Sequence, residues 1–140
     1  MSKENKKKPY KGTKDKKVTV KKQYLDLYYM LPECVGAKEL AKVMLDAAPK
    51  YAESLECWEE AGVLEIMVGE EGSIDFEMLE LSEDEVQDDF LQAHKITAVY
   101  LVHTDTTQLG ETKKLVAGLI EKFGGLLCSD SKDFMPIILQ

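Results

Sequence analysis

Arginine is missing from this chain of 140 residues, and its 18 basic residues are all lysine. Arginine supplies the bidentate contacts by which proteins most often bind phosphate groups and guanine. The sequence carries a net charge of −8, which would repel a nucleic acid along most of the surface. We therefore expect no specific binding of DNA or RNA.

Long apolar segments are missing as well. The longest uncharged run is residues 96–104, far short of the ~20 apolar residues that span a bilayer. No apolar run follows the basic N-terminus, so the sequence predicts neither a membrane segment nor a signal peptide. Three cysteines without a C-x-x-C pair argue against a disulfide framework or a zinc cluster. We expect a cytoplasmic protein with reduced thiols, no cofactor and no membrane contact.

Sequence motifs of the common catalytic and nucleotide-binding sites do not occur in the chain. It has no phosphate-binding loop, dinucleotide fingerprint, H-E-x-x-H or G-x-S-x-G pattern. The sequence Gly69–Gly72 (GEEG) resembles a phosphate loop only in its glycines, since its two glutamates would repel phosphate. We expect it to form a hairpin turn.

The charges present are unevenly distributed. Residues 1–22 contain ten lysines against Glu4 and Asp15, a net charge of +8, which leaves −16 for the rest of the chain. Residues 1–17 have few apolar side chains, so we expect a disordered basic tail that precedes one acidic domain over residues 18–140. Such a tail could contact RNA, a membrane surface or the acidic domain, or could simply aid solubility.

A stretch without lysine, from Tyr51 to His94, contains fifteen acidic residues. It could be a solvated surface, but dense negative charge also attracts cationic partners and speeds their association. The sequence predicts a non-enzymatic protein that binds a basic partner, such as an inhibitor or immunity protein for a toxin or nuclease. The expected contacts are carboxylates of this stretch: Glu70, Glu71, Asp75, Glu77, Glu80, Glu83, Asp84, Glu85, Asp88 and Asp89.

Hydrophobic periodicity predicts the secondary structure. Strands are expected at 24–31, 64–68, 74–81 and 96–103, with a final strand or two from residues 126–129 and 134–139. Helices are expected at 37–48, 50–61, 83–93 and between Asp105 and Gly124. The order β-α-α-β-β-α-β-α-β predicts a single-domain α/β or α+β sandwich with a mixed sheet, resembling a ferredoxin-like unit with an added helix and strand. The expected core consists of Leu27, Leu40, Leu55, Trp58, Ile66, Phe76, Phe90, Val99, Leu101, Leu115 and Leu119.

A small enzyme or ligand-binding regulatory domain is the alternative function, with a pocket near His103–Thr107. Cys128 and His103 are candidates for a nucleophile and its base, although we expect a strand offset to separate them. His103, Asp105, Asp130 and Asp133 are candidate metal ligands. Asp105 as a helix cap and the other two aspartates as turn residues are the simpler interpretation. Cys34 and Cys57 are expected to be inert.

Overall fold

A computed structural model describes residues 23–69 and 72–140 of the chain. Residues 1–22, with the predicted tail, and the predicted contacts Glu70 and Glu71 lie outside the described residues. The strands are β1 (Tyr24–Leu31), β2 (Leu55–Trp58), β3 (Val63–Val68), β4 (Gly72–Met78), β5 (Ala98–Asp105), β6 (Leu126–Ser129) and β7 (Ile137–Leu139). The α-helices are α1 (Ala37–Ala47), α2 (Glu83–Val86), α3 (Asp89–Ala93) and α4 (Leu109–Phe123).

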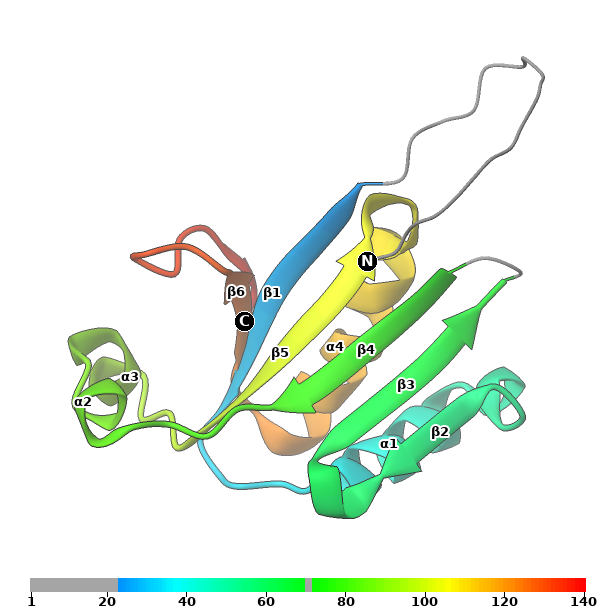
Figure 1. Cartoon of the computed structure of the whole chain (residues 1–140), viewed down its shortest axis with the longest axis horizontal. Coiled ribbons are helices and arrows are strands. Elements are labelled where there is room, and N and C mark those ends of the chain that lie inside the picture. Colours follow the sequence, from blue (N-terminus) through cyan, green and yellow to red (C-terminus); the bar gives the residue numbers. More distant parts are fainter. Residues whose placement is uncertain (1–22, 70–71) are drawn as a thin grey trace, which may run out of the picture.

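The seven strands form one sheet in the order β2-β3-β4-β5-β1-β6-β7. Helices α1 and α4 cover one face of this sheet, whereas α2 and α3 lie at one end of the other side (Figure 1). The predicted single-domain α+β class is confirmed. The predicted mixed sheet is wrong, because every pair of neighbouring strands is antiparallel. The ferredoxin-like order is not confirmed, since strand β2 lies where a helix over residues 50–61 was expected.

The helix predicted over residues 50–61 is wrong. Short 3₁₀ turns at Pro49–Tyr51 and Glu59–Ala61 flank strand β2, which pairs with β3. Leu55 and Cys57 pack on the main core, while Glu56 and Trp58 are exposed, a period of two that fits a strand. Pairing with β3 decided the structure here over the weaker helical pattern.

The helix predicted over residues 83–93 is divided into two. Ser82 and Glu85 form a capping box at the start of α2, with Ser82 N donating to Glu85 Oε1 at 2.9 Å. Asp88 then begins α3, because its carboxylate accepts hydrogen bonds from Phe90 N and Leu91 N. This second cap explains the break between the two short helices.

The main core lies between the sheet and helices α1 and α4. Two tyrosines at its centre are completely buried and place their hydroxyls on backbone carbonyls. Tyr29 Oη donates to Gly124 O at 3.0 Å, and Tyr100 Oη donates to Val35 O at 2.6 Å. Buried hydroxyls need such partners, so these bonds fix the connections next to each helix.

Most of the predicted core is buried, but Trp58 is not. The buried members are Leu27, Leu40, Ile66, Phe76, Val99, Leu115 and Leu119. Leu55, Phe90 and Leu101 are half-buried. Trp58 is 47% exposed, because β2 turns it to the side opposite the helices.

A smaller apolar cluster lies on the other side of the sheet, where α2 and α3 pack over its end. Its buried members are Met30, Leu91, Ile96, Val99, Leu126 and Cys128. Near its start, strand β5 packs against apolar side chains on both faces, through Ala98 and Tyr100 on one and Val99 on the other. Farther along, only the face that carries Val102 remains in the apolar core. No helix within residues 23–69 and 72–140 is long and apolar enough to cross a bilayer.

Candidate functional site

The side of the sheet opposite α1 and α4 is largely uncovered between β2 and β1. Successive strand side chains alternate between the two faces, so the register places every second residue on this side. We call this surface the open face. Its residues are Tyr24, Asp26, Glu56, Trp58, Val63, Glu65, Met67, Ser73, Asp75, Glu77, Leu101 and His103.

Five ionisable residues form a continuous row across the open face. Glu56 pairs with Glu65, which pairs with Asp75 on the next strand. Asp75 pairs with His103, which in turn pairs with Asp26. Directly opposite residues on neighbouring strands have Cβ atoms about 4.5–5.5 Å apart. The row therefore places three carboxylates side by side before the single histidine. We call these five residues the cross-strand row.

The carboxyls at the centre of the row have perturbed acidities. Burial raises the pKa of Glu65, and the negative charges of Asp75 and Glu56 raise it further. Burial also raises the pKa of Asp75, while the charge of His103 and side-chain hydrogen bonds with Ser73 and Glu65 oppose that shift. Asp75 Oδ1 is buried and accepts no hydrogen bond from the described residues. An unsatisfied buried acceptor costs stability until a donor reaches it.

His103 is held in one orientation at the other end of the row. A hydrogen bond of 2.6 Å joins its Nδ1 to Asp26 Oδ1, and both side chains are 42% exposed. The ring of Tyr24 stacks on the imidazole, with centroids 5.1 Å apart and planes 14° from parallel. These contacts position an imidazole at the surface beside two carboxylates.

Large hydrophobic side chains are exposed around the cross-strand row. Tyr24 is 61% exposed, Trp58 47% and Met67 44%. They lie on β1, β2 and β3, so they surround the carboxylates on the same face. Aromatic residues and methionine are enriched in protein interfaces, where tryptophan and tyrosine often carry much of the binding energy.

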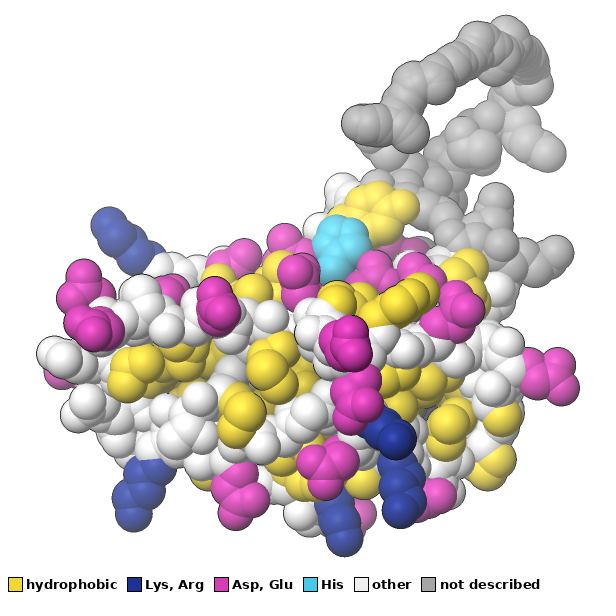
Figure 2. Space-filling model, turned by 60° about the horizontal axis from the view of Figure 1, so that its bottom comes forward, with side chains coloured by type: hydrophobic (Ala, Val, Ile, Leu, Met, Phe, Trp, Pro, Cys, Tyr) yellow, Lys and Arg dark blue, Asp and Glu magenta, His cyan; other side chains and the backbone are white. Residues whose placement is uncertain are grey.

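Positive charge lies mostly on the opposite side of the molecule. Lys38 and Lys42 belong to α1, and Lys113, Lys114 and Lys122 belong to α4. No lysine occupies a strand position of the open face within the described part of the chain. Figure 2 shows most of the visible lysines in the lower half of the view, with one at the upper left, and more of the carboxylates in the upper half. The protein thus has an electrostatic polarity across its sheet.

The acidic contacts predicted from the sequence fall into two groups. Asp75 and Glu77 lie on β4 in the open face. Glu80 follows β4, and the remaining described members, Glu83, Asp84, Glu85, Asp88 and Asp89, lie on or beside α2 and α3.

Sequence analysis missed Asp26, Glu56 and Glu65 as members of the site. Alternation in the strand sequence of β1 marks Asp26 as outward-facing, because apolar residues flank it on both sides. Glu56 could not be placed on this face, because the sequence pattern predicts a helix over residues 50–61 instead of strand β2. Glu65 lies between Leu64 and Ile66, which are both completely buried, so its outward position also follows from alternation.

Cys128 and His103 do not form a nucleophile and base. Strands β5 and β6 lie on opposite sides of β1, which separates their backbones by about 10 Å. Cys128 is buried and level with Tyr28 and Leu101, one row away from His103. Burial raises the pKa of the Cys128 thiol to about 12, with a smaller effect of Asp130, so the thiol stays protonated at neutral pH.

The four candidate metal ligands are not brought together. His103 lies on the open face, whereas the buried Asp105 accepts hydrogen bonds from Thr107 N and Gln108 N, as a cap does. Asp133 accepts hydrogen bonds from Ser131 Oγ and Met135 N in the β6–β7 connection. Among residues 23–69 and 72–140, no group of three or more His, Cys, Asp or Glu side chains has the geometry of a metal site.

Comparisons of this chain with protein family models, with curated proteins and with solved structures find no match.

Proposed function

We propose that the open face binds a basic protein partner and that this binding, rather than catalysis, is the function of the protein. The observation that carries the proposal is the cross-strand row of carboxylates with exposed Tyr24, Trp58 and Met67 around it. Carboxylates supply charge complementarity to a basic partner, while the apolar side chains supply contact area that is removed from water.

The cross-strand row is unfavourable for the isolated protein, which supports a binding role. Like charges directly opposite each other destabilise a sheet. Lysine at one of the positions 56, 65 or 75 would relieve this repulsion, yet all three are acidic. A lysine or arginine of a partner would neutralise the same charges and could donate to Asp75 Oδ1, which accepts no hydrogen bond from the described residues.

The acidic residues on α2 and α3 extend the negative potential beyond the open face. Glu83, Asp84 and Asp89 are exposed and lie at the end of the same side of the sheet. Clustered negative charge accelerates the approach of a cationic partner at low ionic strength. More specifically, we propose that the partner is a basic toxin or nuclease. The acidic surface would inhibit such a partner by occupying the site where it binds phosphate groups.

Two variants of equal charge change test this proposal. The open-face variant carries Asp26→Asn, Glu65→Gln and Asp75→Asn. The helix-face variant carries Glu39→Gln, Asp46→Asn and Glu121→Gln, all exposed positions on α1 and α4. Each is immobilised beside the wild type for quantitative capture from the native cell, with bound proteins identified by mass spectrometry.

The expected result is a basic protein retained by the wild type and the helix-face variant but depleted on the open-face variant. Equal capture by all three chains would contradict the proposal. Loss on a third variant with Glu83→Gln, Asp84→Asn and Asp89→Asn, without loss on the open-face variant, would move the binding surface to α2 and α3.

A small enzyme or ligand-binding domain centred on His103 is the second candidate function. The short hydrogen bond between His103 Nδ1 and Asp26 Oδ1 favours it, because a general base is often oriented by such a carboxylate. His103→Gln separates the two functions, with the cellular phenotype of the gene as the readout. A folded His103→Gln protein that retains the wild-type phenotype supports binding. Because His103 also belongs to the cross-strand row, loss of the phenotype supports the second candidate only when the variant still captures the basic partner as the wild type does.

A further inference from the structure

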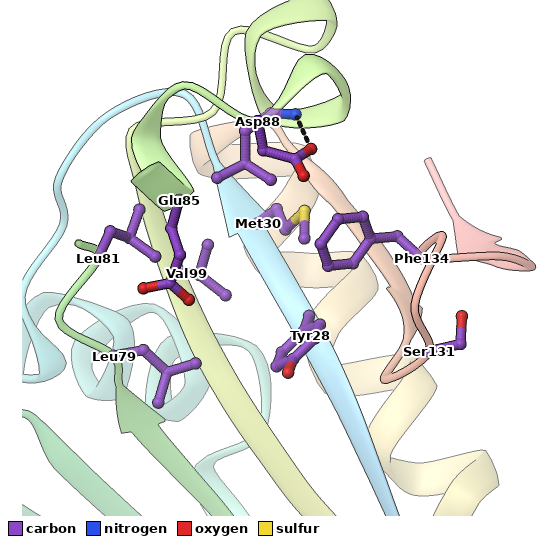
Figure 3. A pocket seen from close by; sticks show the side chains of 10 residues that line it. Tyr28, Met30, Leu79, Leu81, Glu85, Asp88, Val99, Ser131 and Phe134 are labelled. Carbon is purple, nitrogen blue, oxygen red and sulfur yellow. Dashed lines mark hydrogen bonds between the residues drawn. The ribbon is translucent and has the colours of Figure 1, made fainter. Parts of the chain in front are cut away.

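A cavity of about 250 Å³ lies on the side of the open face, at the end that α2 and α3 cover (Figure 3). Tyr28 and Met30 of β1 and Val99 of β5 line its base. Leu81, which precedes α2, and Phe134, from the β6–β7 connection, flank it from opposite sides in Figure 3. Four segments far apart in the sequence thus border a largely apolar space.

Two carboxylates, Glu85 and Asp88, also line the cavity. Glu85 accepts the hydrogen bond from Ser82 N through Oε1, and Asp88 accepts that from Phe90 N through Oδ1. Each cap therefore occupies one oxygen of its carboxylate. No lysine is among the residues that line the cavity. A ligand would meet negative charge beside apolar walls.

Two aromatic rings add to the preference for a cation. Tyr28 and Phe134 meet edge to face, with centroids 5.9 Å apart and planes at 61°. Burial and the neighbouring Asp130 raise the pKa of Tyr28 to about 12, so its hydroxyl stays protonated at neutral pH. The ring faces of tyrosine and phenylalanine attract organic cations, and a neutral phenol preserves that attraction.

We propose that this cavity binds a small apolar ammonium compound, an aromatic or aliphatic group of about eight carbons that carries one protonated amine. The volume exceeds the roughly 150 Å³ of an engineered apolar cavity that binds one benzene molecule. The apolar part would lie against Met30, Val99 and Leu81, and the ammonium group would face Glu85 and Asp88. This site is separate from the cross-strand row and does not depend on the proposed partner.

NMR titration of the full chain with three probes of similar shape tests the proposal. The probes are the 2-phenylethylammonium ion, the neutral 2-phenylethanol and the anionic 3-phenylpropionate. The expected result is a shift of the methyl signals of Met30, Val99 and Leu81, with affinity highest for the ammonium ion and lowest for the anion. Absence of these shifts with the ammonium ion, or equal affinity for the alcohol, would overturn the proposal.

A double variant tests the role of the carboxylates without removing the helix caps. Glu85→Gln with Asp88→Asn keeps an oxygen acceptor at both caps but removes both charges. It should weaken binding of the ammonium ion roughly five- to tenfold and leave binding of the alcohol unchanged.

The matched control is Glu83→Gln with Asp84→Asn, in the first turn of the same helix but outside the cavity. It removes the same charge and should change the affinity for the ammonium ion much less. An equal loss in both double variants would assign the effect to the general negative potential and contradict the site.

Discussion

Glu65 is the residue whose replacement should stabilise the protein most clearly. It lies on β3 directly between Glu56 on one side and Asp75 on the other. Glu65→Gln keeps the size and hydrogen-bonding capacity of the side chain but removes its charge. Two like-charge pairs disappear, and each such cross-strand pair is worth roughly 0.2–1 kcal/mol. We expect the free energy of unfolding at pH 7 to rise by about 0.5–2 kcal/mol.

Thermal unfolding followed by circular dichroism measures this effect. For a domain of this size the gain corresponds to an increase of roughly 2–6 °C in Tm. The pKa of Glu65 is raised, so its carboxyl keeps its proton more readily in the folded protein. The folded state binds the Glu65 proton more tightly than the unfolded state, which stabilises the fold at acidic pH. This stabilisation is lost as the pH rises through the raised pKa. The gain from Glu65→Gln should therefore shrink at acidic pH and in 1 M salt.

Glu77→Gln is the matched control on the neighbouring strand. Glu77 also lies on the open face, but Val63 and Leu101 are directly opposite it, so no like-charge pair is removed. Its replacement should change Tm by much less than that of Glu65. A lower Tm for Glu65→Gln, or equal effects of the two substitutions, would refute the reasoning about the cross-strand row.

Three further predictions concern the core, a connection and the acidity of the row. Leu119→Ala, at a completely buried position of α4, should reduce the free energy of unfolding by about 2–5 kcal/mol in urea denaturation, and a loss below about 1 kcal/mol would contradict its place in the core. Gly125→Ala should prevent accumulation of folded protein, because the alanine Cβ would lie 2.0 Å from Met30 O and the backbone φ of +99° at this position disfavours alanine. A cooperative unfolding transition at the wild-type Tm would contradict this. Asp75→Asn should raise Tm at pH 7 and less so at acidic pH, since the folded pKa of Asp75 is raised, and a pH-independent difference would show that charge is not the cause.

Local patterns in the sequence were sufficient to predict most strands and the helices α1 and α4. The alternating side chains of β1 and the apolar stripe of α4, with Leu115 and Leu119, are each contained in one short segment. Strand β2 could not be predicted in this way. Its four residues fit a helical pattern almost as well, and only pairing with β3 decides between them.

The cross-strand row could not be predicted from the sequence, because its members come from five strands. Asp26 and His103 are 77 residues apart and become neighbours only through the β1–β5 register. A change of one residue in that register would turn either side chain to the other face. The excess of negative charge was visible in the sequence, but which carboxylates share a surface depends on the strand order.

The most direct test of the proposed function is the association rate of the captured partner at two ionic strengths. Surface plasmon resonance would compare the wild type, the open-face variant and the helix-face variant at about 50 and 300 mM salt. The electrostatic account predicts at least roughly tenfold slower association of the open-face variant at the lower salt concentration, with a smaller dependence on salt than the other two chains show. Equal association rates for all three chains at both salt concentrations would contradict the proposal that the open face binds the partner.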